Sequence, residues 1–192
     1  MLDTEKLRRL QGRLEGRPDR TDTGRLMPMT EKALRSTYPP AELVQAFLVE
    51  RLLLVAGEPV RVEDGCVLAF TSLARLIEMD PQARPVQKSG IEAAMLAIGQ
   101  DCPRLLVDGK WVIPRPAVEA LAAGDSWLPP WEDAELQYDL GDSVRILPCT
   151  DPLVIEVSGS TRQEIEAHLL RISRLPRLGV AADRIEFRPV RL

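Results

Sequence analysis

Residues 105–113 constrain the fold of this 192-residue chain more than any other stretch. They form an apolar run, the turn pair Asp108-Gly109, and a second short run that begins at Trp111. An Asp-Gly pair between two apolar runs is a strong local signal for a β-hairpin, because both residues tolerate a positive φ angle. The sequence therefore predicts a two-stranded hairpin at this point.

Two helices are expected directly before the hairpin. The first covers residues 71–79, with Thr71 as its N-cap, and a break follows at Asp80-Pro81. The second spans about residues 86–98 and stops at Gly99. Two helices followed by a β-hairpin is the order of elements in a winged-helix module, so the second helix would take the recognition position.

A further helix is expected before this pair. Apolar residues recur near the 3.6-residue period over 41–54, Pro40 suits the first helical position, and Gly57 ends the run. Residues 60–68 then form either a small hairpin or the short first strand that winged helices pair with their wing. A short helix over 117–121 follows the main hairpin. We predict a winged-helix-like domain over residues 40–124.

The last part of the chain predicts three strands and one helix. The strands fall at residues 144–147, 153–157 and 184–188, and Thr161 with Glu164 gives a capping-box signature for the helix. We therefore predict a small α+β domain over residues 136–192. The predicted fold class is α+β: a winged-helix-like domain followed by a small three-stranded sheet with one covering helix.

Residues 1–39 are expected to form a basic, partly flexible N-terminal arm. Four leucines fall on one side of a short helix, with basic residues beside them: Leu2, Leu7, Leu10 and Leu14, then Arg8, Arg9 and Arg13. Two interpretations are open. The arm is either a partly ordered leader to the first domain or a contact to phosphate or to an acidic partner.

Residues 125–135 are expected to be a Trp/Pro-rich linker. Trp127 and Trp131 flank Leu-Pro-Pro, and two prolines favour an extended backbone. The segment is either an exposed docking segment or a place where the chain packs its own tryptophan rings. Glu132, Asp133 and Glu135 follow as a solvated acidic stretch.

A known family shares part of this pattern. The run 91–99 and the following Arg-Leu-Leu-Val-Asp-Gly-Lys-Trp-Val-Ile resemble the winged-helix tails of phage and plasmid primase-helicase proteins. Those tails end in a helix with an alanine, leucine and glycine finish, then a VDGK hairpin bearing a tryptophan. The resemblance covers about residues 70–115 and implies the shape of the module. The GxxxxGK[ST] motif is absent, so ATPase or primase activity is not implied.

The charge distribution bounds the choice of partner. The formal net charge is −4 and the pI is about 5.2, which argues against a protein that coats nucleic acid. Residues 58–135 carry thirteen acidic and seven basic side chains. The expected contacts to nucleic acid or to a partner, besides those of the arm, are Arg84, Lys88, Arg104, Lys110 and Arg115.

Enzymatic chemistry is not indicated. The cysteines Cys66, Cys102 and Cys149 are far apart, and His168 is the only histidine, so neither a metal site nor a nucleophile–histidine pair is suggested. We expect no cofactor, no metal and no catalytic residue. No signal peptide or membrane-spanning run is apparent, and a cytoplasmic location is expected.

Two functions follow from these patterns. The leading hypothesis is a non-enzymatic accessory subunit of a nucleic-acid-handling complex, related to a mobile element or a defence system, which docks through its winged helix. The alternative is a protein–protein adapter or structural subunit with no nucleic-acid contact. Clustering of the basic residues on one face would favour the first hypothesis, and an exposed apolar patch would favour the second.

Overall fold

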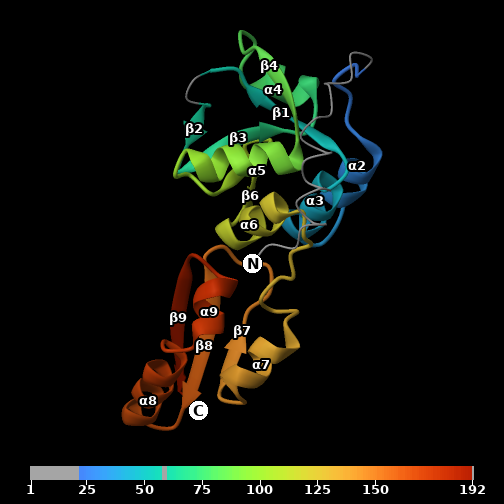
Figure 1. Ribbon diagram of the computed structural model, residues 1–192. Coiled ribbons are helices and arrows are strands. Elements are labelled where there is room, and N and C mark those ends of the chain that lie inside the picture. The colour runs from blue at the N-terminus through green and yellow to red at the C-terminus, as the bar shows by residue number, and fades with distance from the viewer. Residues whose placement is uncertain (1–21, 58–59, 192) are drawn as a thin grey trace, which may run out of the picture. The chain divides into compact units, whose positions relative to one another are not determined.

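The computed structural model describes residues 22–57 and 60–191, a mixed α+β structure with two sheets (Figure 1). These residues form two compact units. The first runs to Ile113 and includes Ala117–Trp127, and the second comprises Pro114–Pro116 and the chain from Leu128 onward. No helix within the described ranges is long and apolar enough to cross a membrane.

The first unit is built on a six-stranded sheet with strand order β4-β1-β3-β5-β6, in which β2 pairs with β3. Its helices and strands, in chain order, are α2 (Pro28–Leu34), α3 (Pro39–Phe47), β1 (Arg51–Val55), β2 (Val62–Glu63), β3 (Cys66–Phe70), α4 (Leu73–Met79), β4 (Pro85–Ser89), α5 (Gly90–Gly99), β5 (Leu105–Val107), β6 (Trp111–Ile113) and α6 (Arg115–Ala123), of which the part from Ala117 onward belongs to this unit.

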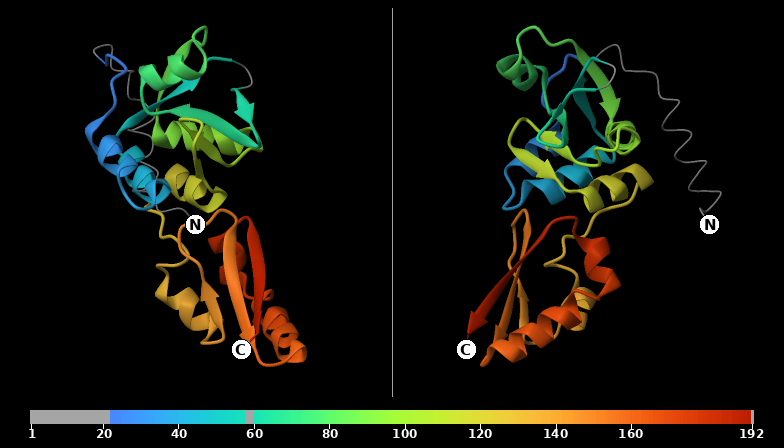
Figure 2. Two further views of the ribbon diagram at one scale, coloured as in Figure 1. Left: turned by 180° about the vertical axis from the view of Figure 1, so that it is seen from behind. Right: turned by 90° about the vertical axis from the view of Figure 1, so that its left-hand side faces the viewer.

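The two faces of this sheet carry different helices, because successive residues of a strand point to opposite sides. Leu52 and Leu54 of β1 point into the main core, which α2, α3, α5 and α6 complete. Leu53 points the other way and packs with Phe70 and with Leu76 of α4. Figure 2 lets the reader follow these helices from behind and from the side.

The expected hairpin over residues 105–113 is confirmed. Strands β5 and β6 are antiparallel, with Leu105 opposite Ile113. The turn residues Asp108 and Gly109 have φ angles of 52° and 65°, as their sequence required. Both alternatives for residues 60–68 are seen in part, since β2 and β3 form an antiparallel hairpin and β3 also pairs in parallel with β5 of the larger hairpin.

The helix expected over residues 41–54 is wrong in its second half. Helix α3 ends at Phe47, and strand β1 begins at Arg51. The run Leu52-Leu53-Leu54 is buried on both faces of an inner strand, and such a strand has a continuous apolar sequence instead of an alternating one. Periodicity alone does not separate it from a buried helix.

The recognition helix expected over residues 86–98 is also wrong in part. Residues Pro85–Ser89 form strand β4, and α5 begins at Gly90. Ser89 caps α5 in a capping box with Glu92, which fixes the start of the helix. Strand β4 therefore separates α4 from α5, and the expected helix–turn–helix is absent from the described part of this unit.

A smaller correction concerns the cap of α4. Its N-cap is Ser72, whose hydroxyl accepts a hydrogen bond from the amide of Arg75. Thr71, the expected cap, instead donates its hydroxyl to Asp108, 2.6 Å away.

The second unit holds a three-stranded sheet with strand order β7-β8-β9. Strand β8 pairs antiparallel with β7 and parallel with β9. The elements are α7 (Ala134–Leu140), β7 (Val144–Ile146), β8 (Leu153–Gly159), α8 (Arg162–Ile172), α9 (Pro176–Ala181) and β9 (Ile185–Arg191). The three expected strands are confirmed, and so is the expected helix, which Thr161 caps.

The expectation of a single covering helix is wrong, because α7 and α9 also contribute to this core. Leu136 and Leu140 of α7 and Leu178 of α9 are buried beside Ile172 of α8. Asp133, expected in a solvated linker, caps α7 by accepting hydrogen bonds from its first amides. Both added helices are short, so neither gave a clear helical period in the sequence.

Candidate functional site

The structure does not bring the expected basic contacts together. Arg84 precedes β4 and Lys88 lies on it, whereas Arg104 precedes β5 and Lys110 lies in the β5–β6 turn. Strands β1 and β3 lie between β4 and β5, which at about 4.8 Å a strand separates the two groups by roughly 14 Å. Arg115 belongs to the second unit. The expected contacts Arg8, Arg9 and Arg13 lie outside the described residues.

Lys88 and Lys110 each make an intramolecular contact. Lys88 Nζ lies 3.7 Å from a carboxylate oxygen of Glu92. Lys110 Nζ lies 4.5 Å from the ring centroid of Trp111, in cation–π geometry. The expected basic contacts of the first unit are thus dispersed over two regions of its sheet.

The two tryptophans of the expected docking segment pack against the cores of their own units. Trp127 is half-buried against the main core of the first unit, with its ring centroid 6.5 Å from that of Tyr38. Trp131 is half-buried against the core of the second unit. Both rings contribute packing area there.

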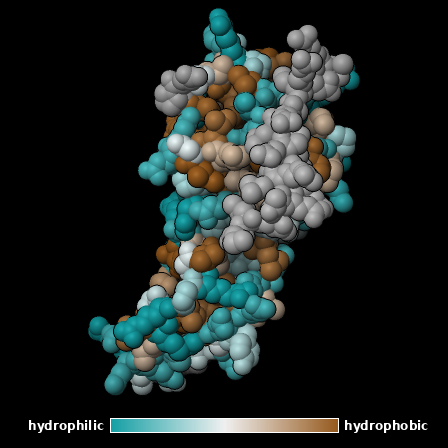
Figure 3. All heavy atoms as spheres, viewed as in Figure 1, coloured by the Kyte–Doolittle hydropathy of each residue, from teal (hydrophilic) through white to brown (hydrophobic). Residues whose placement is uncertain are grey.

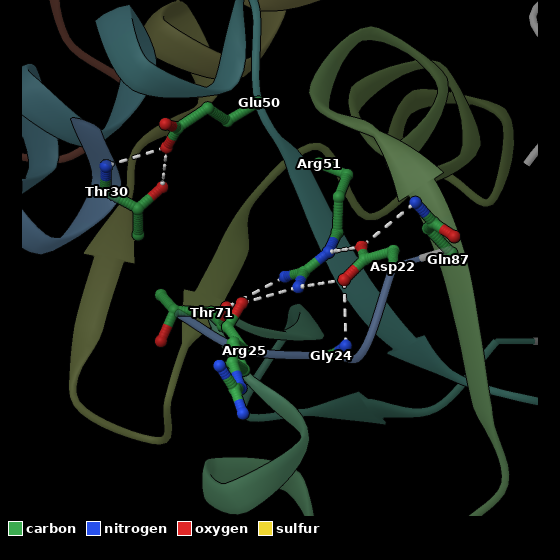
Figure 4. Close-up of polar contacts among 8 residues, drawn as sticks. All are labelled: Asp22, Gly24, Arg25, Thr30, Glu50, Arg51, Thr71 and Gln87. Carbon is green, nitrogen blue, oxygen red and sulfur yellow. Dashed lines mark hydrogen bonds and ion pairs between the residues drawn. The ribbon is translucent and has the colours of Figure 1, made fainter. Parts of the chain in front are cut away.

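A buried polar network on the α4 face of the first sheet was not expected. Arg51 is 8% exposed, and its guanidinium pairs through Nε and Nη2 with the carboxylate of Asp22. It also donates to the carbonyls of Thr71 at 3.0 Å and Arg25 at 2.6 Å. Gln87 of β4 donates to the same carboxylate at 3.1 Å. Figure 4 shows these side chains converging from β1, β4 and the segment before α2.

The electrostatics of this network explain how the chain around Asp22 is held. Hydrogen bonds from Arg51 hold the pKa of the Asp22 carboxyl below its usual value, although burial raises it. The amide of Gly24 adds a hydrogen bond of 2.8 Å. The Arg51 guanidinium donates its hydrogen bonds to a carboxylate and two carbonyls of the same chain. The network therefore anchors the segment around Asp22 and is not an open anion site.

A second buried carboxylate stabilises the start of α2. Glu50, directly before β1, accepts from the amides of Met29 and Thr30 at 2.8 Å and 2.7 Å, and from the Thr30 hydroxyl. The N-cap residue of α2, Met27, makes no side-chain hydrogen bond. Glu50 therefore serves as a remote cap for the first amides of that helix (Figure 4).

A groove beside α5 is lined in part by exposed apolar side chains of the first unit. Helix α5 has one charged residue, Glu92, and its alanines face the core. On its outer side Met95 is 46% exposed and Ile98 is 41% exposed. A groove of about 410 Å³ runs along this side, lined by Lys88, Glu92, Met95, Leu96, Gly99 and Gln100. Figure 3 shows hydrophobic atoms gathered over this part of the unit.

The charged side chains of the groove are already engaged in contacts within the chain. Its carboxylate, Glu92, is held by the amide and hydroxyl of Ser89 at 2.9 Å and 3.0 Å. The lining residues include no cysteine, serine or histidine. Within the described ranges, no group of three or more His, Cys, Asp or Glu side chains could hold a metal ion. The exposed apolar side chains beside these residues form a surface that can bind another apolar surface.

Sequence reasoning missed both the network and the groove, although one signal was visible. The run 91–98 contains a single charge, which is unusual for a helix at a protein surface. Comparison of the chain with protein-family models, curated proteins and solved structures gave no match.

Proposed function

We propose that this chain is a non-enzymatic protein–protein adapter, whose first unit binds an amphipathic helix of a partner in the groove between β4 and α5. One observation carries this proposal. Helix α5 is apolar nearly all round, yet it exposes Met95 and Ile98 beside a groove. A helix of that composition is normally covered on every side.

The groove suits a helix as its ligand. Exposed methionine adapts to different apolar shapes, and helix-in-groove recognition uses apolar anchors at positions i, i+3 or i+4, and i+7. The neighbouring edge strand supports this mode over strand addition, because Pro85 cannot donate a backbone hydrogen bond. The first unit would therefore hold a partner helix through side chains.

Site-specific photocrosslinking tests this proposal. A photoreactive amino acid at Met95 should capture a defined protein in the cells of origin. The same amino acid at Ile77 should not, since Ile77 is 47% exposed but lies on α4, which covers the opposite face of the sheet. The substitution Met95→Glu should abolish binding of the captured protein and leave the fold intact. Equal capture at both positions would overturn the proposal.

A nucleic-acid-handling accessory subunit, related to a mobile element or a defence system, is the second candidate. Its support is the β5–β6 hairpin, the wing of the winged-helix interpretation, which presents the exposed Lys110 at its turn. Binding to a labelled duplex and a labelled single strand at two salt concentrations tests it. Phosphate contact predicts an affinity that falls steeply with salt and falls further with Lys110→Glu. Absence of binding at low salt would remove this candidate.

A further inference from the structure

We infer that the leucine side chains of residues 1–21, the part of the N-terminal arm that lies outside the described ranges, dock in the groove between β4 and α5 of the same molecule. This inference rests on the proposed function, because both assign a helix to that groove. It goes further by naming the segment that occupies the groove until a partner displaces it. The arm would then act as an internal competitor for the binding site.

The sequence of the arm has the anchors that such a groove requires. Leu7, Leu10 and Leu14 are spaced i, i+3 and i+7, which places them on one side of a helix. This is the spacing that an amphipathic helix uses to insert side chains into an apolar groove. The exposed Met95 and half-buried Leu96 supply the complementary surface.

The anchor of the arm lies beside the groove. Asp22, where the described chain begins, is bound by Arg51 and by Gln87 of β4. The next residue of that strand, Lys88, points to the opposite face and lines the groove. Strand β4 is the edge of the sheet, so no other strand lies between the anchor and the groove.

The arm is long enough to turn around this edge. Seven residues lie between Leu14 and Asp22, and the eight steps from one Cα to the other span up to about 27 Å when extended. Layers of secondary structure pack about 10 Å apart, so the leucines can reach the α5 side of the sheet. Tethering also raises the effective concentration of the arm at the groove, to about the millimolar range.

Charge complementarity favours the same pairing. Residues 1–25 carry seven basic and five acidic side chains, whereas residues 58–135 carry seven basic and thirteen acidic ones. In the arm, Arg8, Arg9 and Arg13 flank the leucines. Glu92 in the groove already pairs with Lys88 and accepts hydrogen bonds from Ser89, whereas Asp101, which follows the end of α5, is exposed. A basic flank of the arm would therefore meet Asp101 at that end of the groove.

Disulfide trapping in the full-length chain tests the inference. Cys149 is the exposed cysteine of the described chain, so Cys149→Ser gives a suitable background. Leu10→Cys combined with Met95→Cys should oxidise to a monomeric disulfide about tenfold faster than Leu10→Cys combined with Ile77→Cys. Leu7→Cys and Leu14→Cys, each with Met95→Cys, guard against a shift in helix register.

The results separate this inference from the proposed function. Equal rates for the Met95 and Ile77 pairs at all three leucines would overturn the inference, and so would exclusive formation of disulfide-linked dimers. Photocrosslinking at Met95 is then repeated with Leu7, Leu10 and Leu14 changed to Asp, which should increase partner capture severalfold. A trapped arm without partner capture supports the inference and overturns the adapter. Partner capture without a trapped arm supports the adapter and overturns the inference.

Discussion

The two faces of the six-stranded sheet are covered in different ways. One face is covered by α2, α3, α5 and α6, and its contacts are apolar side chains spread over many residues. The other face is covered by α4 and by the segment 22–25, which Arg51 and Gln87 hold through one carboxylate. Both faces have apolar contacts, but on the second face the attachment of segment 22–25 depends on a few polar atoms, where a single substitution should have a large effect.

Removing the Arg51 guanidinium should have the largest effect. Arg51→Met leaves the Asp22 carboxylate and two carbonyls without their donors, and breaking a buried ion pair in this way lowers the free energy of unfolding by about 3–5 kcal/mol. Urea denaturation followed by circular dichroism measures the change.

Arg75→Met is the matched control, because Arg75 lies on α4 and its side chain is 59% exposed. It should change the free energy of unfolding by less than about 1 kcal/mol. The double variant Arg51→Met with Asp22→Leu should recover part of the loss, since it leaves no unpaired charge. Similar losses of unfolding free energy in Arg51→Met and Arg75→Met would show that the Arg51 network contributes no more to stability than an exposed ion pair.

The apolar face has one position, Gly90, at which even a methyl side chain should be destabilising. A Cβ atom on Gly90, the first residue of α5, would overlap the carbonyl oxygen of the buried Phe47. Gly90→Ala should therefore lower the free energy of unfolding by about 1–3 kcal/mol. Gly99→Ala, at the other end of the same helix, meets no atom within 4 Å and should raise it by up to about 1 kcal/mol. Melts in which both variants shift in the same direction would contradict this prediction.

The smallest expected effect is the pH dependence of the Asp22 anchor. The lowered pKa means that the unfolded chain binds a proton more readily than the folded chain, so stability rises with pH. The contribution is complete above the unfolded pKa of about 3.9, and it is lost as the pH falls through the lower folded pKa. Urea midpoints between pH 7 and pH 3 should therefore fall more steeply for the native chain than for Asp22→Asn. Parallel slopes would show that Asp22 is not the titrating anchor.

The elements that were predictable from sequence are those specified by neighbouring residues. The β5–β6 hairpin was predictable because Asp108-Gly109 specifies its turn locally. Strand β1 was mistaken for helix because a strand buried on both faces loses its alternation. The start of α5 at Ser89 had a local signal, since Ser89 and Glu92 have capping-box spacing.

The candidate sites were less predictable, for two physical reasons. The network joins residues distant in sequence, with Asp22 and Gln87 sixty-five positions apart. No local pattern specifies such a contact. The groove depends on which apolar side chains stay exposed, and Met95 has the same character as its buried neighbours. Lys88, which was expected to contact nucleic acid or a partner, lines the groove.

The register of β4 against β1 also decides which backbone groups of β4 are available to pair with a further strand. Ala56 donates to the carbonyl of Arg84, so alternate residues from Arg84 bond to β1, while Pro85, Gln87 and Ser89 turn their backbone outward. Pro85 has no amide proton, and the capping box of α5 already uses the amide of Ser89. Within β4, Gln87 alone presents an outward amide proton to an incoming strand. The outer edge of β4 therefore offers few backbone hydrogen bonds to a strand of another molecule, which disfavours edge-to-edge aggregation at this edge.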